Sequence, residues 1–326
     1  MIALSICIPT YNRSEYLQEC LTSVLTSTAE HASEVEIVIS DNASTDATGD
    51  IVRTFQEAHP WIRYHRNEEN IGGERNFYLL ATLAKGENIW VFGDDDKMEE
   101  RAVARVLDNI RAGYCLTICN YSQWDKHFVV QLKKCGLPGD QDQTFKDPNE
   151  IMKRFGLNLS YISSVVIKKS LFLKITAEEY EYFMEYGLSF LFAVYNGIQN
   201  GNSKVRFISE PIFCNRSGNS GDYDWYKYFV TGTSLIFDEL LHKGYKKDAV
   251  FVAKQALLTD FVTPSIFGLR LKLSARENCR SLAILNKHFK SHWQFWVFCV
   301  PRFLVPSFLL LLAKKMRHTM RFLIYY

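Results

Sequence analysis

Four short apolar runs lie in the first hundred residues, and helix-like stretches separate them. The runs are residues 4–9, 35–40, 61–65 and 88–92, each of strand length. Between them, apolar residues recur at the three- and four-residue spacing of an amphipathic helix. Short strands that alternate with helices of about ten to fifteen residues are typical of βαβ units, which place their strands parallel in one sheet. The chain is therefore predicted to begin as an α/β domain.

Polar clusters follow three of these runs, at residues 10–13, 41–46 and 94–96. The carboxyl ends of parallel strands meet at one edge of a sheet, where ligands bind. The last cluster is three consecutive aspartates after Gly93, a residue that lets the backbone bend sharply. Adjacent carboxylates repel one another unless a cation or hydrogen-bond donors offset them, and oxygen-only ligands suit a hard cation. An acidic turn that merely closes a core strand is the alternative interpretation.

Composition sets the scale of the fold and limits the partners. The chain has 326 residues, 47% of them hydrophobic, which suits one domain with an extension or two domains. The net charge of +2 gives no reason to expect nucleic acid. We expect the eight cysteines to be reduced, mostly buried thiols of a cytosolic protein, because no second close pair completes a zinc-finger spacing with Cys115 and Cys119. The first strand begins without a basic leader, so no signal peptide is expected.

Four segments, in order, resemble motifs of the family 2 glycosyltransferases. The resemblance covers about residues 3 to 100 and implies a GT-A fold, a mostly parallel α/β sheet flanked by helices that binds a nucleotide-diphosphate sugar. The aromatic second half resembles transferases of O-antigen and other surface polysaccharides, the abequosyltransferase-like group among them. The matching segments are Ser5–Asn12 (SICIPTYN), Ile37–Asp46 (IVISDNASTD), Asn70–Asn76 (NIGGERN) and Asp94–Asp96, which resembles the family's DxD motif.

The resemblance also implies a division of the chain. Residues 1–230 are expected to form the catalytic domain, with a nucleotide-sugar half at 1–100 and an acceptor half at 101–230. Residues 231–326 are expected to form a helical extension that ends in a basic, apolar tail.

A nucleotide-diphosphate sugar, the donor of such a reaction, needs protein partners for its base, its ribose, its phosphates and the cation that they bind. Asp41, at a strand end, can accept a hydrogen bond from a pyrimidine ring. The family pattern implies that Asp94 lies near the ribose, that Asp96 binds Mn²⁺ or Mg²⁺ together with Asp94, and that Asp95 supports them. The remaining predicted donor contacts are Pro9, Thr10, Tyr11 and Asn12 near the base and ribose, and Arg75 and Arg216 near the phosphates. Tyr11 as a core residue and Arg75 as a solvated helix residue stay open as alternatives.

The general base is harder to place, because the acidic pair usual in the family is missing. Glu185 is the first candidate and Glu181 the second, both in a glutamate-rich segment about ninety residues after the DxD. Solvent-facing helix glutamates, or a retaining mechanism without such a base, are the alternatives. A strand predicted at 161–167 carries Ser163 and Ser164, which either contact ligand or face solvent.

Taken together, these features predict a metal-dependent transfer of a sugar to a hydroxyl of a glycan acceptor in polysaccharide biosynthesis. A non-catalytic nucleotide-binding or membrane scaffold protein is the alternative from another class. A nucleotidyltransferase is a further alternative, disfavoured because no glycine-rich loop follows the first strand. The donor nucleotide and sugar, the acceptor and the stereochemistry stay open.

The segment 293–313 is long and apolar enough to cross a bilayer, which takes about twenty residues. However, Pro301, Arg302 and Pro306 interrupt it, and no acidic residue follows Glu277. Basic residues beside aromatic ones favour an anionic membrane surface. We therefore predict peripheral attachment to the cytoplasmic face of the cell membrane, which suits a polyprenyl-linked acceptor. A docked helix pair or a dimer interface is the alternative.

Overall fold

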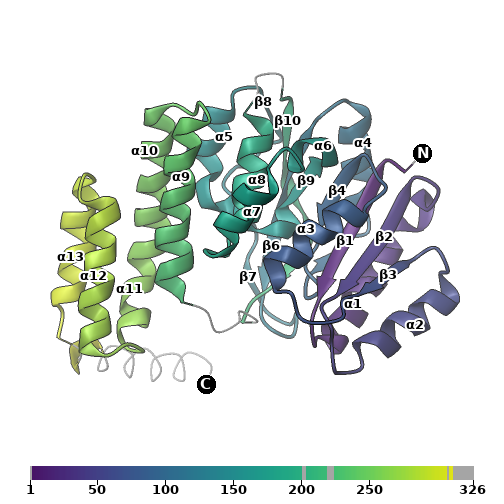
Figure 1. Cartoon of the computed structure of the whole chain (residues 1–326), viewed down its shortest axis with the longest axis horizontal. Coiled ribbons are helices and arrows are strands. Elements are labelled where there is room, and N and C mark those ends of the chain that lie inside the picture. The colour runs from purple at the N-terminus through teal and green to yellow at the C-terminus, as the bar shows by residue number, and fades with distance from the viewer. Residues whose placement is uncertain (1, 200–202, 219–223, 307, 311–326) are drawn as a thin grey trace.

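The computed structural model describes residues 2–199, 203–218, 224–306 and 308–310. Within these residues, ten strands form one sheet, and the N-terminal strands lie at the opposite end of the molecule from the last helices (Figure 1). The strands are β1 (Leu4–Thr10), β2 (Val35–Asp41), β3 (Arg63–Arg66), β4 (Asn88–Val91), β5 (Lys97–Met98), β6 (Leu116–Trp124), β7 (Gln131–Lys133), β8 (Gln143–Phe145), β9 (Val165–Lys168) and β10 (Val205–Arg216).

Helices flank the sheet and then continue beyond it (Figure 1). Three segments with wider, π-type turns, η4 (Tyr226–Gly232), η5 (Leu257–Val262) and η6 (Phe295–Cys299), run directly into the α-helices that follow them. The α-helices are α1 (Ser14–Thr28), α2 (Thr48–Ala58), α3 (Gly73–Leu83), α4 (Ala102–Arg111), α5 (Pro148–Phe155), α6 (Lys169–Phe172), α7 (Ala177–Met184), α8 (Ser189–Ile198), α9 (Thr233–His242), α10 (Lys247–Ala256), α11 (Thr263–Arg270), α12 (Ala275–Phe289) and α13 (Val300–Leu304).

The strand–helix alternation predicted for the first hundred residues is confirmed. The first four strands are parallel, in the order β3-β2-β1-β4, with Leu4 paired to Val35 on one side and to Asn88 on the other. Every residue of β1 and β2 is buried, which explains why these strands read as continuous apolar runs. Their carboxyl ends therefore open at one edge of the sheet.

The second half of the sheet is mixed. Strand β9 lies antiparallel between β4 and β6, and β10 runs parallel to β6. The strand predicted at 161–167 begins only at Val165, because Ile162–Ser164 form a 3-10 turn. That turn lets the Ser163 carbonyl accept the Trp90 indole N–H at 2.8 Å, while the Ser163 hydroxyl accepts the Gly93 N–H at 2.9 Å. Residues 131–150 contain the short strands β7 and β8 and the start of α5.

The polar turn after β2 caps two helices. Asp46 accepts hydrogen bonds from the backbone N–H groups of Ser14 and Thr48, both at 3.0 Å. Ser14 is the first residue of α1. A carboxylate at a helix N-terminus satisfies N–H groups that the helix leaves unpaired, and one side chain does this for α1 and α2 together.

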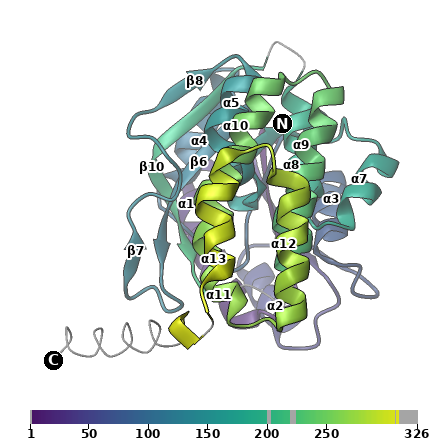
Figure 2. The same cartoon turned by 90° about the vertical axis from the view of Figure 1, so that its left-hand side faces the viewer.

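The C-terminal helices pack in two groups. Phe237 of α9 and Val250 of α10 belong to the same buried cluster as the sheet, whereas Leu258 of η5 and Phe289 of α12 belong to a separate cluster. Figure 2 shows α12 and α13 side by side next to α11. The domain boundary predicted near residue 230 stays a prediction, since α9 and α10 share the core of the sheet.

One helix among the described residues is long and apolar enough to cross a membrane. It runs from Lys247 to Arg270 through α10, η5 and α11, with a mean hydropathy of 1.2 in its most apolar window. Because 44% of that window is buried inside the protein, the apolar composition also serves packing. The finding is weak evidence for a membrane span.

Candidate active site

Two neighbouring cavities lie at the carboxyl ends of β1, β2 and β4. The acidic cavity has a volume of about 350 Å³ and is lined by Pro9, Thr10, Tyr11, Arg13, Asn42, Asn70, Gly73, Asn76, Phe77, Gly93, Asp94, Asp95 and Ile162. The aromatic cavity has a volume of about 450 Å³ and is lined by Ile71, Gly72, Gly73, Glu74, Arg75, Phe77, Met184, Gly187, Leu188, Tyr228 and Phe229. Gly73 and Phe77 line both, so the two cavities adjoin at the start of α3.

Two of the three consecutive aspartates face the acidic cavity. The guanidinium of Arg13 bridges them, at 3.1 Å from Asp94 and 3.0 Å from Asp95. Burial raises the pKa of Asp94 to about 6, although Arg13 opposes that rise. The charge of Asp95 adds to the rise, so burial and a neighbouring carboxylate both favour the protonated form of Asp94.

Asp96 lies beneath the cavity and does not line it. Its Oδ2 accepts hydrogen bonds from the Tyr161 hydroxyl at 2.5 Å and the Ser163 hydroxyl at 2.6 Å. Its Oδ1 accepts a longer bond, at 3.4 Å, from the Asn215 amide. Burial raises the pKa of Asp96 to about 7. The sequence pattern, which made Asp96 a metal ligand, could not predict Tyr161 and Asn215 as its partners.

The turn offers carboxylate oxygens as metal ligands, and such ligands suit a hard cation. Mn²⁺ and Mg²⁺ take oxygen ligands, and Asp94 and Asp95 present carboxylates to the cavity. A divalent cation beside these carboxylates would favour their charged forms. Among the described residues, no group of three or more His, Cys, Asp or Glu side chains is placed to hold a metal ion. The two carboxylates would therefore need further oxygen ligands from the bound donor or water.

Asp41 is buried at the end of β2, and its carboxylate already accepts hydrogen bonds from other residues of the protein. It accepts hydrogen bonds from the Ser44 N–H at 2.8 Å and the Tyr64 hydroxyl at 2.7 Å, and Arg66 lies 3.5 Å away. Its neighbour Asn42 lines the acidic cavity, whereas Asp41 does not. Asp41 therefore holds the turn, and a pyrimidine would compete with Tyr64 for its oxygen.

In the turn after β1, some of the predicted contact residues line the acidic cavity and one does not. Pro9, Thr10 and Tyr11 line the acidic cavity, and the Tyr11 side chain is exposed rather than part of the core. Asn12 has a left-handed backbone, donates its N–H to the Ser44 hydroxyl at 2.9 Å and accepts the Thr45 N–H at 2.7 Å. Asn12 therefore joins the two turns and does not line the cavity.

Arg216 is buried inside the protein and is not part of a free loop. Strand β10 extends through this residue, and its Nε donates to the Asp95 carbonyl at 3.0 Å. The guanidinium also pairs with Glu19 and lies 4.1 Å above the Phe128 ring. It would have to leave these partners to bind phosphate. The chain is described for two residues beyond Arg216, and residues 219–223 lie outside the described residues.

The glutamates predicted as general bases lie on the surface. Glu181 pairs with Arg75 at 2.7 Å, and both side chains are more than half exposed. Glu185 is 68% exposed and lies 3.6 Å from Lys227. Arg75 lines the aromatic cavity, but neither of these glutamates lines either cavity.

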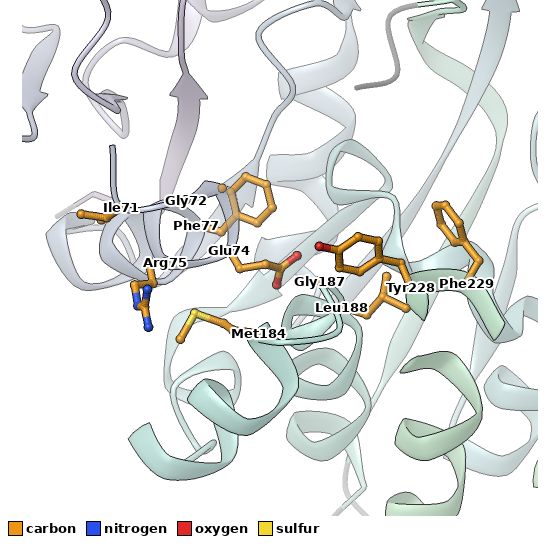
Figure 3. Close-up of a pocket in the computed structure, with 11 residues that line it drawn as sticks. Ile71, Gly72, Glu74, Arg75, Phe77, Met184, Gly187, Leu188, Tyr228 and Phe229 are labelled. Carbon is orange, nitrogen blue, oxygen red and sulfur yellow. The ribbon is translucent and has the colours of Figure 1, made fainter. Parts of the chain in front are cut away.

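Glu74 is the carboxylate that the sequence interpretation missed. It lines the aromatic cavity, where its carboxylate points toward the Tyr228 hydroxyl (Figure 3). It accepts hydrogen bonds from the hydroxyl of Ser189 and, at 3.3 Å, from the N–H of Phe190. The only signal in the sequence is its position directly after a double glycine, where attention fell on Arg75 instead.

The N-terminal half of the chain has an identifiable sequence family. Residues 5–158 match the model named "Glycosyl transferase family 2". This segment belongs to glycosyl transferase family 2. The family 2 segment extends beyond the four motifs, through α5 and into the 3-10 turn that follows it.

Several curated relatives of the family 2 segment are bacterial proteins that are named as glycosyltransferases. The abequosyltransferase RfbV of Salmonella typhimurium is 31% identical over 176 residues, which are 51% of this chain and 53% of RfbV. The GalNAc(5)-diNAcBac-PP-undecaprenol beta-1,3-glucosyltransferase of Campylobacter jejuni is 28% identical over 151 residues, 45% of this chain and 47% of that protein. The chain spans about half the length of these two relatives.

Solved structures share the fold over most of the chain. S. aureus TarS residues 1–349 in complex with UDP-GlcNAc have a TM-score of 0.64 and 16% identity, covering 88% of this chain and 80% of that one. The mannosyltransferase PcManGT of Pyrobaculum calidifontis, in complex with GDP-Man and Mn²⁺, has a TM-score of 0.55 and 15% identity, covering 92% and 84%. With the family 2 segment, this likeness confirms the predicted GT-A fold and its helical C-terminal part.

Proposed function

We propose that this protein transfers a sugar from a nucleotide-diphosphate sugar to a hydroxyl group of a glycan acceptor. The observation that carries this proposal is the meeting of the two cavities at Gly73 and Phe77. The acidic cavity holds the nucleotide diphosphate, and the aromatic cavity holds the acceptor. The bond between sugar and phosphate then lies where the cavities join.

Donor binding depends on the polar ends of β1, β2 and β4. Asn42 lines the acidic cavity and offers both a donor and an acceptor to the base. Asp94 and Asp95 would hold Mn²⁺ or Mg²⁺, and such a cation would supply positive charge beside the diphosphate leaving group. Asp96 acts from below by fixing the turn through Tyr161 and Ser163.

The acceptor is a sugar chain in our proposal. Phe77, Tyr228 and Phe229 give the aromatic cavity flat apolar walls on which sugar rings pack. By their names, one relative transfers abequose, and another transfers glucose to a glycan carried by undecaprenyl diphosphate. We therefore infer a polyprenyl-linked glycan of surface-polysaccharide biosynthesis as the acceptor.

Such an acceptor places the enzyme at the cytoplasmic face of the cell membrane. The described part of the predicted membrane segment includes a ten-residue apolar helix, Phe295–Leu304, too short to span a bilayer. Phe295 is buried in the helical cluster, whereas Trp296 of this helix is 54% exposed and Trp293, just before it, is 61% exposed. These exposed tryptophans support interfacial attachment. Residues 307 and 311–326, which include the end of the predicted segment, lie outside the described residues.

A donor screen tests the proposed function. The full-length protein is incubated with UDP-, dTDP-, GDP- and CDP-sugars in Mn²⁺, and release of the nucleotide is measured with water as the acceptor. We expect release from one nucleotide class and its loss in excess chelator. If no nucleotide is released from any of these sugars, and calorimetry detects no binding of UDP, dTDP, GDP or CDP, the proposal is contradicted and a scaffold role is favoured.

A further inference from the structure

We propose that Glu74 is the general base that accepts the proton of the attacking hydroxyl. This inference rests on the proposed function. Its first support is position: Glu74 follows Gly73, the residue at which the acidic and aromatic cavities adjoin. A carboxylate at that boundary faces the place where the acceptor oxygen must meet the anomeric carbon. A base has to lie within hydrogen-bond reach of the proton it takes, so position is the first requirement.

The carboxylate is held in place by a second element. The Ser189 hydroxyl and the Phe190 N–H both donate to Oε2, and both belong to the first turn of α8. Among the described residues, Oε1 of Glu74 accepts no hydrogen bond. One oxygen is therefore anchored, while the other is available to a ligand in the aromatic cavity.

The surroundings of Glu74 also favour proton uptake. Burial raises the pKa of its carboxyl group, and the hydrogen bonds from Ser189 and Phe190 only partly oppose that rise. A carboxylate that has lost its water accepts a proton more readily than one on the surface. Glu181, in contrast, is exposed and its pKa is lowered by its pairing with Arg75.

The proposed step balances with one proton transfer and one exchange of bonds. The acceptor hydroxyl gives its proton to Oε1 of Glu74, and its oxygen forms a bond to the anomeric carbon of the donor sugar. The bond between that carbon and the phosphate oxygen breaks, and its electron pair leaves with the nucleotide diphosphate. The direct displacement inverts the configuration at the anomeric carbon, and Glu74 later loses its proton to solvent.

Replacement of the glutamates tests the assignment. Release of nucleotide from the donor identified by the screen is compared for Glu74→Gln, Glu185→Gln and Glu181→Gln, with water as the acceptor, since water also needs a base. Glu178→Gln is the matched control, because Glu178 is an exposed residue of α7 outside both cavities. We expect Glu74→Gln to lower turnover about a hundredfold or more, with the control at the wild-type rate.

Nucleotide affinity and rescue separate chemistry from folding. In calorimetry, Glu74→Gln should bind the nucleotide of that donor within about twofold of wild type. Added formate should restore turnover to Glu74→Ala, which a purely structural role of Glu74 would not allow. Full turnover in Glu74→Gln, loss of nucleotide binding together with turnover, or failure of formate to rescue would overturn the assignment of Glu74. A wild-type protein that neither binds nor turns over any donor would instead overturn the proposed function.

Discussion

The three consecutive aspartates after β4 lie in two different environments. Asp94 and Asp95 face the acidic cavity beside Arg13, whereas Asp96 is enclosed by Tyr161 and Ser163. A residue that faces ligand and a residue that fixes a turn respond differently to substitution. Removing the first changes binding, while removing the second also disturbs the packing around it.

Asp94→Asn tests the cation at the residue scale. The amide keeps the size of the side chain but loses the charge that attracts a divalent cation. We expect the dissociation constant of the donor in Mn²⁺ to rise about tenfold or more, measured by calorimetry. In excess chelator, wild type and variant should bind the donor equally weakly.

The control for this change is Asp108→Asn, since Asp108 is 72% exposed on α4, where it pairs with Arg111. Equal donor affinity of wild type and Asp94→Asn in Mn²⁺ would remove Asp94 from the cation site.

Elements that lie far apart in the sequence meet to form the walls of the aromatic cavity. The aromatic cavity is walled by α3, by the turn between α7 and α8, and by η4 at the start of the C-terminal helices. Gly187, in that turn, has a φ of +66°, and a Cβ atom there would lie 2.6 Å from the ring of Tyr228. The close approach of this turn to η4 therefore requires glycine.

Gly187→Ala tests the wall of the aromatic cavity. The methyl group cannot fit unless Tyr228 moves, so the acceptor site should open while the acidic cavity keeps its shape. We expect transfer to a glycan acceptor to fall about tenfold or more, with donor affinity unchanged. Gly113→Ala is the matched control, because Gly113 has a φ of +78° but nothing within 4 Å of the added Cβ. If both variants lose the same activity, backbone strain and not the Tyr228 contact is responsible.

Helix α12 carries a histidine that makes the C-terminal helices sensitive to acid. Burial, followed by the charges of Lys254 and Lys287, lowers the pKa of His288 to about 4. The unfolded chain has an ordinary histidine pKa near 6.5, so between about pH 6.5 and 4 the unfolded state binds more protons. The contribution of the neutral imidazole to the free energy of unfolding is therefore fully present above about pH 6.5, and it is lost as the pH falls toward 4.

His288→Leu should remove this part of the acid sensitivity. We expect wild type to lose about 1 kcal/mol more unfolding free energy than the variant between pH 7 and pH 5, a value reduced for partial exposure of the ring. Chemical denaturation at the two pH values measures it. His127→Leu, at an exposed position, should lose stability in parallel with wild type. Parallel loss in His288→Leu as well would show that His288 does not titrate in this window.

At the scale of the whole molecule, exposed apolar side chains gather at the end opposite the N-terminal strands. They lie on η6 and α13 and in the residues that flank these elements (Figure 1). This end is therefore the part of the described molecule best suited to meet a membrane surface. The large exposed apolar residues of this region are Trp293, Trp296, Val297, Phe298, Leu304, Phe308 and Leu309.

The double variant Trp293→Ser, Trp296→Ser tests membrane attachment. Tryptophan gains from burial at the lipid interface, so we expect co-sedimentation with phosphatidylglycerol vesicles to fall about fivefold or more. The control is Val129→Ser, Leu132→Ser, which removes apolar residues that are 75% and 53% exposed near β7. Unchanged sedimentation of the tryptophan variant, or no sedimentation of wild type, would contradict the attachment.

Local sequence patterns were sufficient to predict the elements and where their polar ends meet. Apolar periodicity and turn residues act over a few positions, and parallel strands necessarily bring their carboxyl ends to one edge. For this reason the alternation of strands and helices from β1 to β4 could be predicted, together with the edge of the sheet where Thr10, Asp94 and Asp95 line a cavity. The GT-A fold was implied by the resemblance of four motifs to the family 2 glycosyltransferases. The reversal of β9 and the 3-10 turn before it could not, because contacts of Ser163 with Trp90 and Gly93 stabilise them.

Tertiary structure alone decided which charged groups face a ligand. Arg216 was expected near the phosphates, yet it is buried and pairs with Glu19, which lies 197 positions earlier in the sequence. The Glu74 carboxylate meets Ser189 across 115 positions of sequence, and no local pattern reports that distance. A charged side chain keeps its partner only if the fold brings the partner within hydrogen-bond reach, so its role is a property of long-range packing rather than of its neighbours in sequence.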